Sequence, residues 1–203
     1  AVEYVIITRE ALTSEFQRLA DWRAAHGLAA EVVTIEWIEA SYPGGVDSAE
    51  RVRLFIQDAY HDQGTLFVLL GGDAEIVPVR YAHMTILGGS DILTDYYYMC
   101  LDGTWNADGD VFFGEVEDEV DLFPEVFAGR APVSTLEEAR AFVDKTLAYE
   151  EGAGGGAHYP TSALFMAERL FAQNDGATIA EQAIAMLPPS FAVERLYEES
   201  QNW

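Results

Sequence analysis

Basic residues are scarce in this chain of 203 residues. Eleven lysines and arginines stand against 35 aspartates and glutamates, Lys145 is the only lysine, and the formal net charge is −24. This balance argues against nucleic acid as a partner, because contacts to phosphates need Lys and Arg. It also argues against binding to an anionic membrane surface. Such acidity is typical of an extracellular, cation-rich setting, although adaptation to high salt gives a similar composition.

Cysteine is almost absent as well. Cys100 is the sole cysteine, which excludes an internal disulfide and leaves the question of secretion open. No apolar run approaches the length of a transmembrane helix. No signal peptide is visible, because the chain opens on the strand-like run 2–8. We interpret that opening as the start of an excised domain or of a mature fragment.

Apolar residues make up half of the chain, so one or two compact domains are possible. Their pattern alternates between short β-branched runs and helical stripes, which predicts an α/β fold with a mainly parallel sheet flanked by helices. Two shorter pieces suit a small hairpin or edge-strand insertion. The predicted strands are 5–8, 31–35, 66–70, 84–87, 96–101, 125–128, 163–167 and 191–197. The predicted helices are 10–26, 47–60, 134–149 and 176–187, with capping boxes at Asp47/Glu50 and Ser134/Glu137.

The Gly-rich segment 151–158 is the clearest linker in the sequence. It divides a first α/β subdomain, 1–150, from a final piece, 159–203, whose strand–helix–strand pattern predicts a βαβ unit. About 45 residues are too few for an independent core. We therefore expect the final piece to open a second domain, and to leave an unpaired sheet edge that invites association.

Carboxylates are concentrated between positions 102 and 125, where nine occur without a lysine or arginine. In the first half, Asp102, Asn106, Asp108 and Asp110 place oxygen ligands around a glycine, as calcium loops do, and Glu115 is a further candidate. The segment lacks the twelve-residue EF-hand pattern. Ordinary turns and a solvated acidic face remain the alternative.

Several other polar residues do not suggest chemistry by themselves. Cys100 lies in an apolar context beside acidic residues, which predicts a buried structural thiol without the positive neighbour that a nucleophile needs. The four histidines lack metal-site spacing. The run Gly71-Gly72-Asp73 is not a Walker motif, and an aspartate there would repel phosphate.

Four patches occur in a fixed order and span nearly the whole chain: 19–33 (LADWRAAHGLAAEVV), 67–78 (FVLLGGDAEIVP), 94–98 (TDYYY) and 124–134 (PEVFAGRAPVS). Together they resemble the gingipain-type cysteine peptidases, whose fold is related to the caspases. The resemblance implies a catalytic domain of two subdomains, of which the second carries the catalytic histidine and cysteine. The family's catalytic segments do not occur before Trp203, so the chain resembles the first subdomain plus the opening βαβ of the second.

The resemblance also implies particular site residues. It implies a calcium site formed by the side chains of Asp73, Asp121 and Glu125 with the carbonyl of Phe123. Independently, three nearby carboxylates favour a hard cation. In arginine-specific members an acidic residue lies at the mouth of the S1 pocket. Here the best-matching position is Thr178, with Asp175 the nearest acid, so a strict arginine preference is not expected.

We therefore expect the N-terminal portion of a secreted or cell-surface bacterial cysteine endopeptidase. The chain would supply scaffold, calcium site and part of the substrate pocket, and it would be inactive alone because no catalytic residue lies within it. Its partners would be the remainder of the peptidase domain and a protein or peptide substrate. The alternative is a non-catalytic, calcium-stabilised interaction module of a surface or secreted protein.

Overall fold

A computed structural model describes residues 1–84, 89–152, 161–171 and 174–198. The chain divides into two compact units, Ala1–Glu151 and Gly152–Trp203, which we describe separately. No helix among the described residues combines the length and the apolar character needed to cross a membrane.

A four-stranded sheet forms the centre of the first unit. Its order is β2 (Ala30–Thr34), β1 (Tyr4–Thr8), β3 (Phe67–Gly71) and β6 (Phe127–Ala131), and every neighbouring pair is parallel. The two inner strands are almost wholly buried, whereas both outer strands are partly exposed. Uninterrupted apolar runs such as that of β3 are expected where both faces of a parallel strand are covered.

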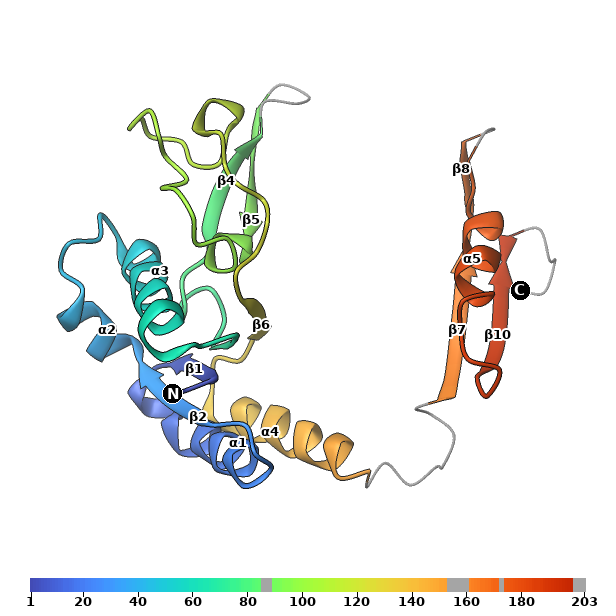
Figure 1. Ribbon diagram of the computed structural model, residues 1–203, viewed down its shortest axis with the longest axis horizontal. Coiled ribbons are helices and arrows are strands. Elements are labelled where there is room, and N and C mark those ends of the chain that lie inside the picture. The colour runs from blue at the N-terminus through green and yellow to red at the C-terminus, as the bar shows by residue number, and fades with distance from the viewer. Residues whose placement is uncertain (85–88, 153–160, 172–173, 199–203) are drawn as a thin grey trace. The chain divides into compact units, whose positions relative to one another are not determined.

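Helices cover both faces of this sheet (Figure 1). On one face α1 (Thr13–Ala25), which follows the short 3-10 helix η1 (Glu10–Leu12), packs beside α4 (Leu136–Glu150). On the other lie α2 (Ile35–Ser41) and α3 (Ser48–Asp58), and α3 continues into the π-helical turn η2 (Ala59–Gln63). The strand order reverses at β1, which makes the sheet doubly wound. An open hollow lined by Arg9, Ala74 and Glu75 lies beyond the carboxyl ends of β1 and β3.

Helix caps fix the starts of α3 and α4. Asp47 accepts a hydrogen bond from the backbone N–H of Glu50 at 2.9 Å, but the Glu50 carboxylate accepts from the N–H of Val46, so the predicted capping box forms only in part. The second capping box lies one residue later than predicted, at Thr135 and Glu138. The reason is that Ser134 is occupied elsewhere, because its hydroxyl donates to Asp73 at the end of β3.

An insertion between β3 and β6 rises from the sheet (Figure 1). It contains an antiparallel hairpin of β4 (Arg80–Met84) and β5 (Ser90–Thr94), followed by the 3-10 helices η3 (Tyr96–Tyr98) and η4 (Val116–Asp118). The predicted strand 96–101 is wrong. Tyr97 and Tyr98 are both fully buried, which a one-sided strand does not allow. Of the predicted strand 84–87, residues 85–87 lie outside the described residues.

The second unit contains a parallel pair, β7 (Ser162–Ala167) and β10 (Ala192–Tyr197), with α5 (Gly176–Ile184) between them in sequence. The predicted helix 176–187 ends earlier, at Ile184. An unpredicted small hairpin joins β8 (Arg169–Phe171) to β9 (Asn174–Asp175). Arg195 and Tyr197 of β10 both bind Glu181 of α5, which fixes the helix on one face of the strand pair.

Candidate functional site

The carboxyl edge of the main sheet holds Asp73, just beyond β3. Its backbone N–H donates to the carbonyl of Val133, and its carboxylate accepts from the Ser134 hydroxyl and from the N–H of Glu75. These hydrogen bonds, that of Ser134 above all, lower the pKa of Asp73. The carboxylate is therefore ionised and bridges the ends of β3 and β6.

The other residues of the calcium set that the resemblance implies lie in the insertion. Asp121 accepts from the N–H of Phe123 at 2.9 Å, and Phe123 has a largely exposed ring. Glu125 accepts from the N–H of Leu101. The described residues contain one group of three carboxylates whose oxygens lie within 4.8 Å of one another, and it does not include Asp73, Asp121 or Glu125. Their role as calcium ligands stays a prediction.

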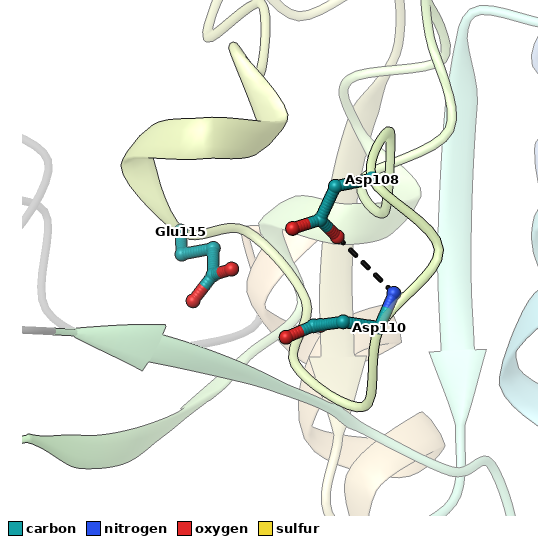
Figure 2. A group of neighbouring side chains, drawn as sticks. All are labelled: Asp108, Asp110 and Glu115. Atoms are coloured by element: carbon teal, nitrogen blue, oxygen red, sulfur yellow. Dashed lines mark hydrogen bonds between the residues drawn. The ribbon is translucent and has the colours of Figure 1, made fainter.

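That group consists of Asp108, Asp110 and Glu115 (Figure 2). One carboxylate oxygen from each lies within 4.8 Å of the others. The Asp108 carboxylate also accepts from the N–H of Asp110 at 3.1 Å, which closes the turn between them. The pKa of Glu115 is raised, mainly by partial burial and secondly by the negative charge of Asp110. Like charges thus converge without a neutralising partner among the described side chains.

Asn106 and Asp102 take different places in the same loop. The Asn106 side chain accepts from the N–H of Gly109 and donates to the carbonyl of Asp110, so it braces the turn that presents Asp108 and Asp110. Asp102 contributes its backbone carbonyl to a buried arginine. The predicted loop set is therefore brought together in part, with Glu115 as its third carboxylate.

Asp118 is the organising residue that the sequence analysis missed. It is buried, and its carboxylate accepts from the backbone N–H groups of Ala107, Gly114 and Glu115 at 2.6, 2.8 and 3.3 Å. One side chain thereby fixes both ends of the acidic loop. Nothing in the spacing distinguishes Asp118 from its acidic neighbours.

Arg53 anchors the segment that leads into this loop. It lies on α3, is 3% exposed, and donates to the carbonyls of Tyr97, Cys100, Asp102 and Gly103. Burial lowers the pKa of Arg53. The arginine therefore binds backbone dipoles in place of water, and it ties the insertion to the main helical layer.

Two more arginines fix the insertion through carboxylates. Arg130 of β6 makes a two-pronged ion pair with Asp95, at 2.7 and 2.6 Å, and also donates to carbonyls after β3. Arg80 pairs with Asp47 in the same two-pronged way and stacks on the Tyr97 ring. Asp95 and Arg130 belong to two of the patches that carry the family resemblance, and the structure joins them directly.

Cys100 is fully buried, and burial is the main reason that its pKa is raised. The charged groups that act on it are Glu125, Asp121 and Arg53. Arg53 is a positive neighbour, contrary to the prediction, but burial and the two carboxylates outweigh it and the pKa of the thiol stays raised. A thiolate nucleophile needs a group that lowers its pKa, usually a histidine. In the described residues His83 pairs with Asp91 instead, and His26 stacks on Trp22. His158 lies outside the described residues.

The two predicted pocket residues lie in the second unit at the start of α5. Asp175 is the N-cap of the helix, and its carboxylate accepts from the N–H of Ala177 at 3.1 Å and from the Thr178 hydroxyl at 2.9 Å. Both residues are exposed. Asp175 and Thr178 are thus brought together, and both carboxylate oxygens of Asp175 already have donors.

A doubly wound parallel sheet with an arginine-clamped acidic insertion makes the first unit an α/β domain. The family model described as "Peptidase family C25" matches residues 1–203, so the chain belongs to peptidase family C25. The predicted family and the predicted fold class are confirmed. A comparison with curated proteins finds no match.

Among solved structures, the chain is similar to the Arg-specific cysteine proteinase gingipain R, with 18% identity and a TM-score of 0.67 over 97% of this chain and 41% of that one. A complex of Porphyromonas gingivalis RgpB pro- and mature domains gives 19% identity and a TM-score of 0.62, covering 97% and 42%. Dimeric latent PorU from Porphyromonas gingivalis gives 26% identity and a TM-score of 0.57, covering 76% and 16%. The chain therefore spans less than half of each of these structures.

Proposed function

We propose that this chain is the N-terminal portion of a secreted cysteine endopeptidase, and that the catalytic histidine and cysteine come from the rest of that protein. The observation that carries the proposal is the family match over all 203 residues, joined to the fact that the one cysteine is buried without a histidine among the charged groups that act on it. In the whole enzyme a thiolate, activated by histidine, would attack a peptide carbonyl and form an acyl-enzyme.

The first unit would serve as the scaffold. Arg53, Arg80 and Arg130, which are buried or half-buried, fix the insertion to the rest of the unit at many points. Such support keeps a functional loop in one geometry. The second unit would contribute part of the S1 wall through Asp175 and Thr178. Because the Asp175 carboxylate is already used as a helix cap, the pocket would not select arginine strictly.

Calcium would stabilise the insertion. The donor set of Asp108, Asp110 and Glu115 fits a hard cation, since the carboxylate oxygens already converge. The pKa of Glu115 is raised, mainly by burial and secondly by the neighbouring carboxylates. The set of Asp73, Asp121, Glu125 and the Phe123 carbonyl remains a second proposed site. It would require these side chains to approach one another more closely than they do.

Activity assays test the peptidase proposal. The 203-residue chain should not cleave a panel of peptide substrates, whereas its parent protein should cleave them and lose activity with a thiol-alkylating reagent. Cys100→Ser in the parent protein should leave that activity unchanged. Cleavage by the chain alone that disappears in the Cys100→Ser variant would refute the proposal.

The alternative is a non-catalytic interaction module that kept the fold and lost the chemistry. What favours it is that Cys100 is unsuited to catalysis. The sequence that follows Trp203 in the parent gene separates the two: a histidine and a cysteine at strand ends favour the peptidase, and their absence favours the module.

The open strand pair of the second unit suggests its partner. Leu164 and Met166 of β7 are 56% and 71% exposed on the face opposite to α5. An apolar sheet face of this kind is normally covered. We infer that the remainder of the peptidase domain covers it, with self-association as the substitute when that remainder is missing. A monomer at every concentration in light scattering would count against self-association.

A further inference from the structure

Strand β2 is an outer strand of the main sheet with an accessible edge. Within the described part of the first unit, β1 is its sole pairing partner. The five residues of β2 contain one charge, Glu31, no proline and no irregularity in their register with β1. An outer strand with one charge and no other blocking feature can pair with another extended chain.

An open hollow of about 320 Å³ lies along this strand. It is lined by residues 31–34 of β2, by Trp37 of α2, by Phe55 of α3 and by Gln63 of η2. Its lining is mixed: Val33 and the rings of Trp37 and Phe55 are apolar, whereas Glu31, Thr34 and Gln63 are polar. The hollow is therefore placed to accept side chains from a segment that pairs with β2.

Trp37 is exposed yet held in place. Its side chain is 52% exposed, whereas Phe55 beneath it is 4% exposed. The rings of Trp37, Tyr42 and Phe55 contact one another edge to face, with centroids 6.0 to 6.3 Å apart. A fixed, exposed tryptophan is the kind of residue that anchors a partner, because little conformational entropy is lost on binding.

The charge around the hollow has one sign. Glu31 lines it, and no lysine or arginine does. Beside the aromatic rings, Tyr42 donates a hydrogen bond to Asp58 at 2.9 Å, and burial together with Asp58 and Asp62 raises the pKa of Tyr42 to about 12. An aromatic face next to carboxylates favours a Lys or Arg side chain, through cation–π contact and charge.

We propose that β2 and this hollow bind an extended basic segment of a protein partner. The segment adds a strand to the edge of β2, seats apolar side chains against Val33 and Phe55, and places a Lys or Arg side chain over Trp37. A second copy that pairs through its own β2 is a poor occupant, because this strand has no Lys or Arg and would bring a second Glu31 to the hollow. The assignment is independent of the proposed peptidase activity.

Titration of the 203-residue chain with short acetylated peptides tests the proposal. The probe alternates valine with lysine and arginine over seven residues. Two comparison peptides are used: one with glutamate in place of each basic residue, and one with every second backbone nitrogen methylated. The probe should bind and the two comparison peptides should not, and higher salt should weaken binding.

Matched variants locate the site. Trp37→Ala should weaken binding of the probe about tenfold, whereas Tyr81→Ala, which removes a similarly exposed ring from the insertion, should leave binding unchanged. Circular dichroism checks that both variants are folded. Equal binding of the glutamate peptide, equal binding of the methylated peptide, or an unaffected Trp37→Ala variant would each overturn the proposal.

Discussion

Replacing Arg53 by methionine should destabilise the first unit by more than any surface change. Methionine keeps the packing of the buried stem but removes every donor to the carbonyls of Tyr97, Cys100, Asp102 and Gly103. A hydrogen bond from a charged group contributes about 1.5–3 kcal/mol, and a buried acceptor that loses its donor costs about 1–3 kcal/mol.

Part of that loss is offset, because the methionine variant no longer has to bury a charged group. The cost of burying the guanidinium is visible in the pKa of Arg53, which burial lowers. We therefore expect a net loss of about 3 kcal/mol in the free energy of unfolding. For a unit of this size, a loss of about 1 kcal/mol lowers Tm by about 2–4 °C. The Arg53→Met variant should thus melt about 6–12 °C below the parent chain.

Arg140→Met is the matched control. Arg140 pairs with Glu15 at 3.0 Å, but its side chain is 58% exposed, so its loss should cost under about 1 kcal/mol. Urea and thermal unfolding are followed by near-ultraviolet circular dichroism, which reports the buried rings of Tyr97, Tyr98 and Trp105. If Arg53→Met is no less stable than Arg140→Met, Arg53 does not anchor the insertion.

Three further predictions concern titration, the thiol and the cation. Burial disfavours the ionised form of Asp47, but the ion pair with Arg80 and the hydrogen bond from the Glu50 N–H outweigh burial and lower the pKa of Asp47. The contribution of Asp47 to stability is therefore complete above its unfolded pKa of about 3.9, and it is lost as pH falls through the lower pKa of the folded state. Unfolding free energies measured between pH 6 and pH 2 should fall at the acid end, and Asp47→Asn should reduce that fall. Cys100 is buried and its pKa is raised, so it should resist a thiol reagent at pH 8 in the native chain and react fully in urea. Fast reaction of Cys100 in the native chain would contradict its burial. Calcium at about 100 times its dissociation constant should stabilise the chain by about 2.7 kcal/mol. The rise in Tm with calcium should exceed the rise with magnesium, disappear in the Asp108→Asn/Asp110→Asn variant and persist in the Glu117→Gln variant. A rise in Tm that survives the double substitution would place the ion elsewhere.

The periodic parts of the fold could be predicted from the sequence. Apolar runs predict β1, β3 and β7 to within a residue of their ends, although only β1 and β3 are buried. The strand predicted at 31–35 ends at Thr34, because the Thr34 hydroxyl caps α2 by accepting from the N–H of Trp37. That short helix was missed, since seven residues are too few to establish a period.

The insertion could not be predicted because its structure depends on distant partners. Tyr97 and Tyr98 are apolar enough for a strand, yet they lie in a 3-10 turn. There the Tyr97 ring contacts Arg53 and Arg80, and the Tyr98 hydroxyl donates to the Pro78 carbonyl. The acidic loop was recognised as a candidate cation site, but Asp118, which organises it through three N–H groups, looks in sequence like any other acidic residue. Long-range contacts of this kind leave no periodic signal.

The most direct measurement compares peptidase activity in the 203-residue chain and in its parent protein, on the same peptide panel and in the presence of calcium. The account predicts no cleavage by the chain, thiol-sensitive cleavage by the parent protein, and no effect of Cys100→Ser on the latter. A parent protein without thiol-sensitive activity, or a chain that is active alone, would contradict the account.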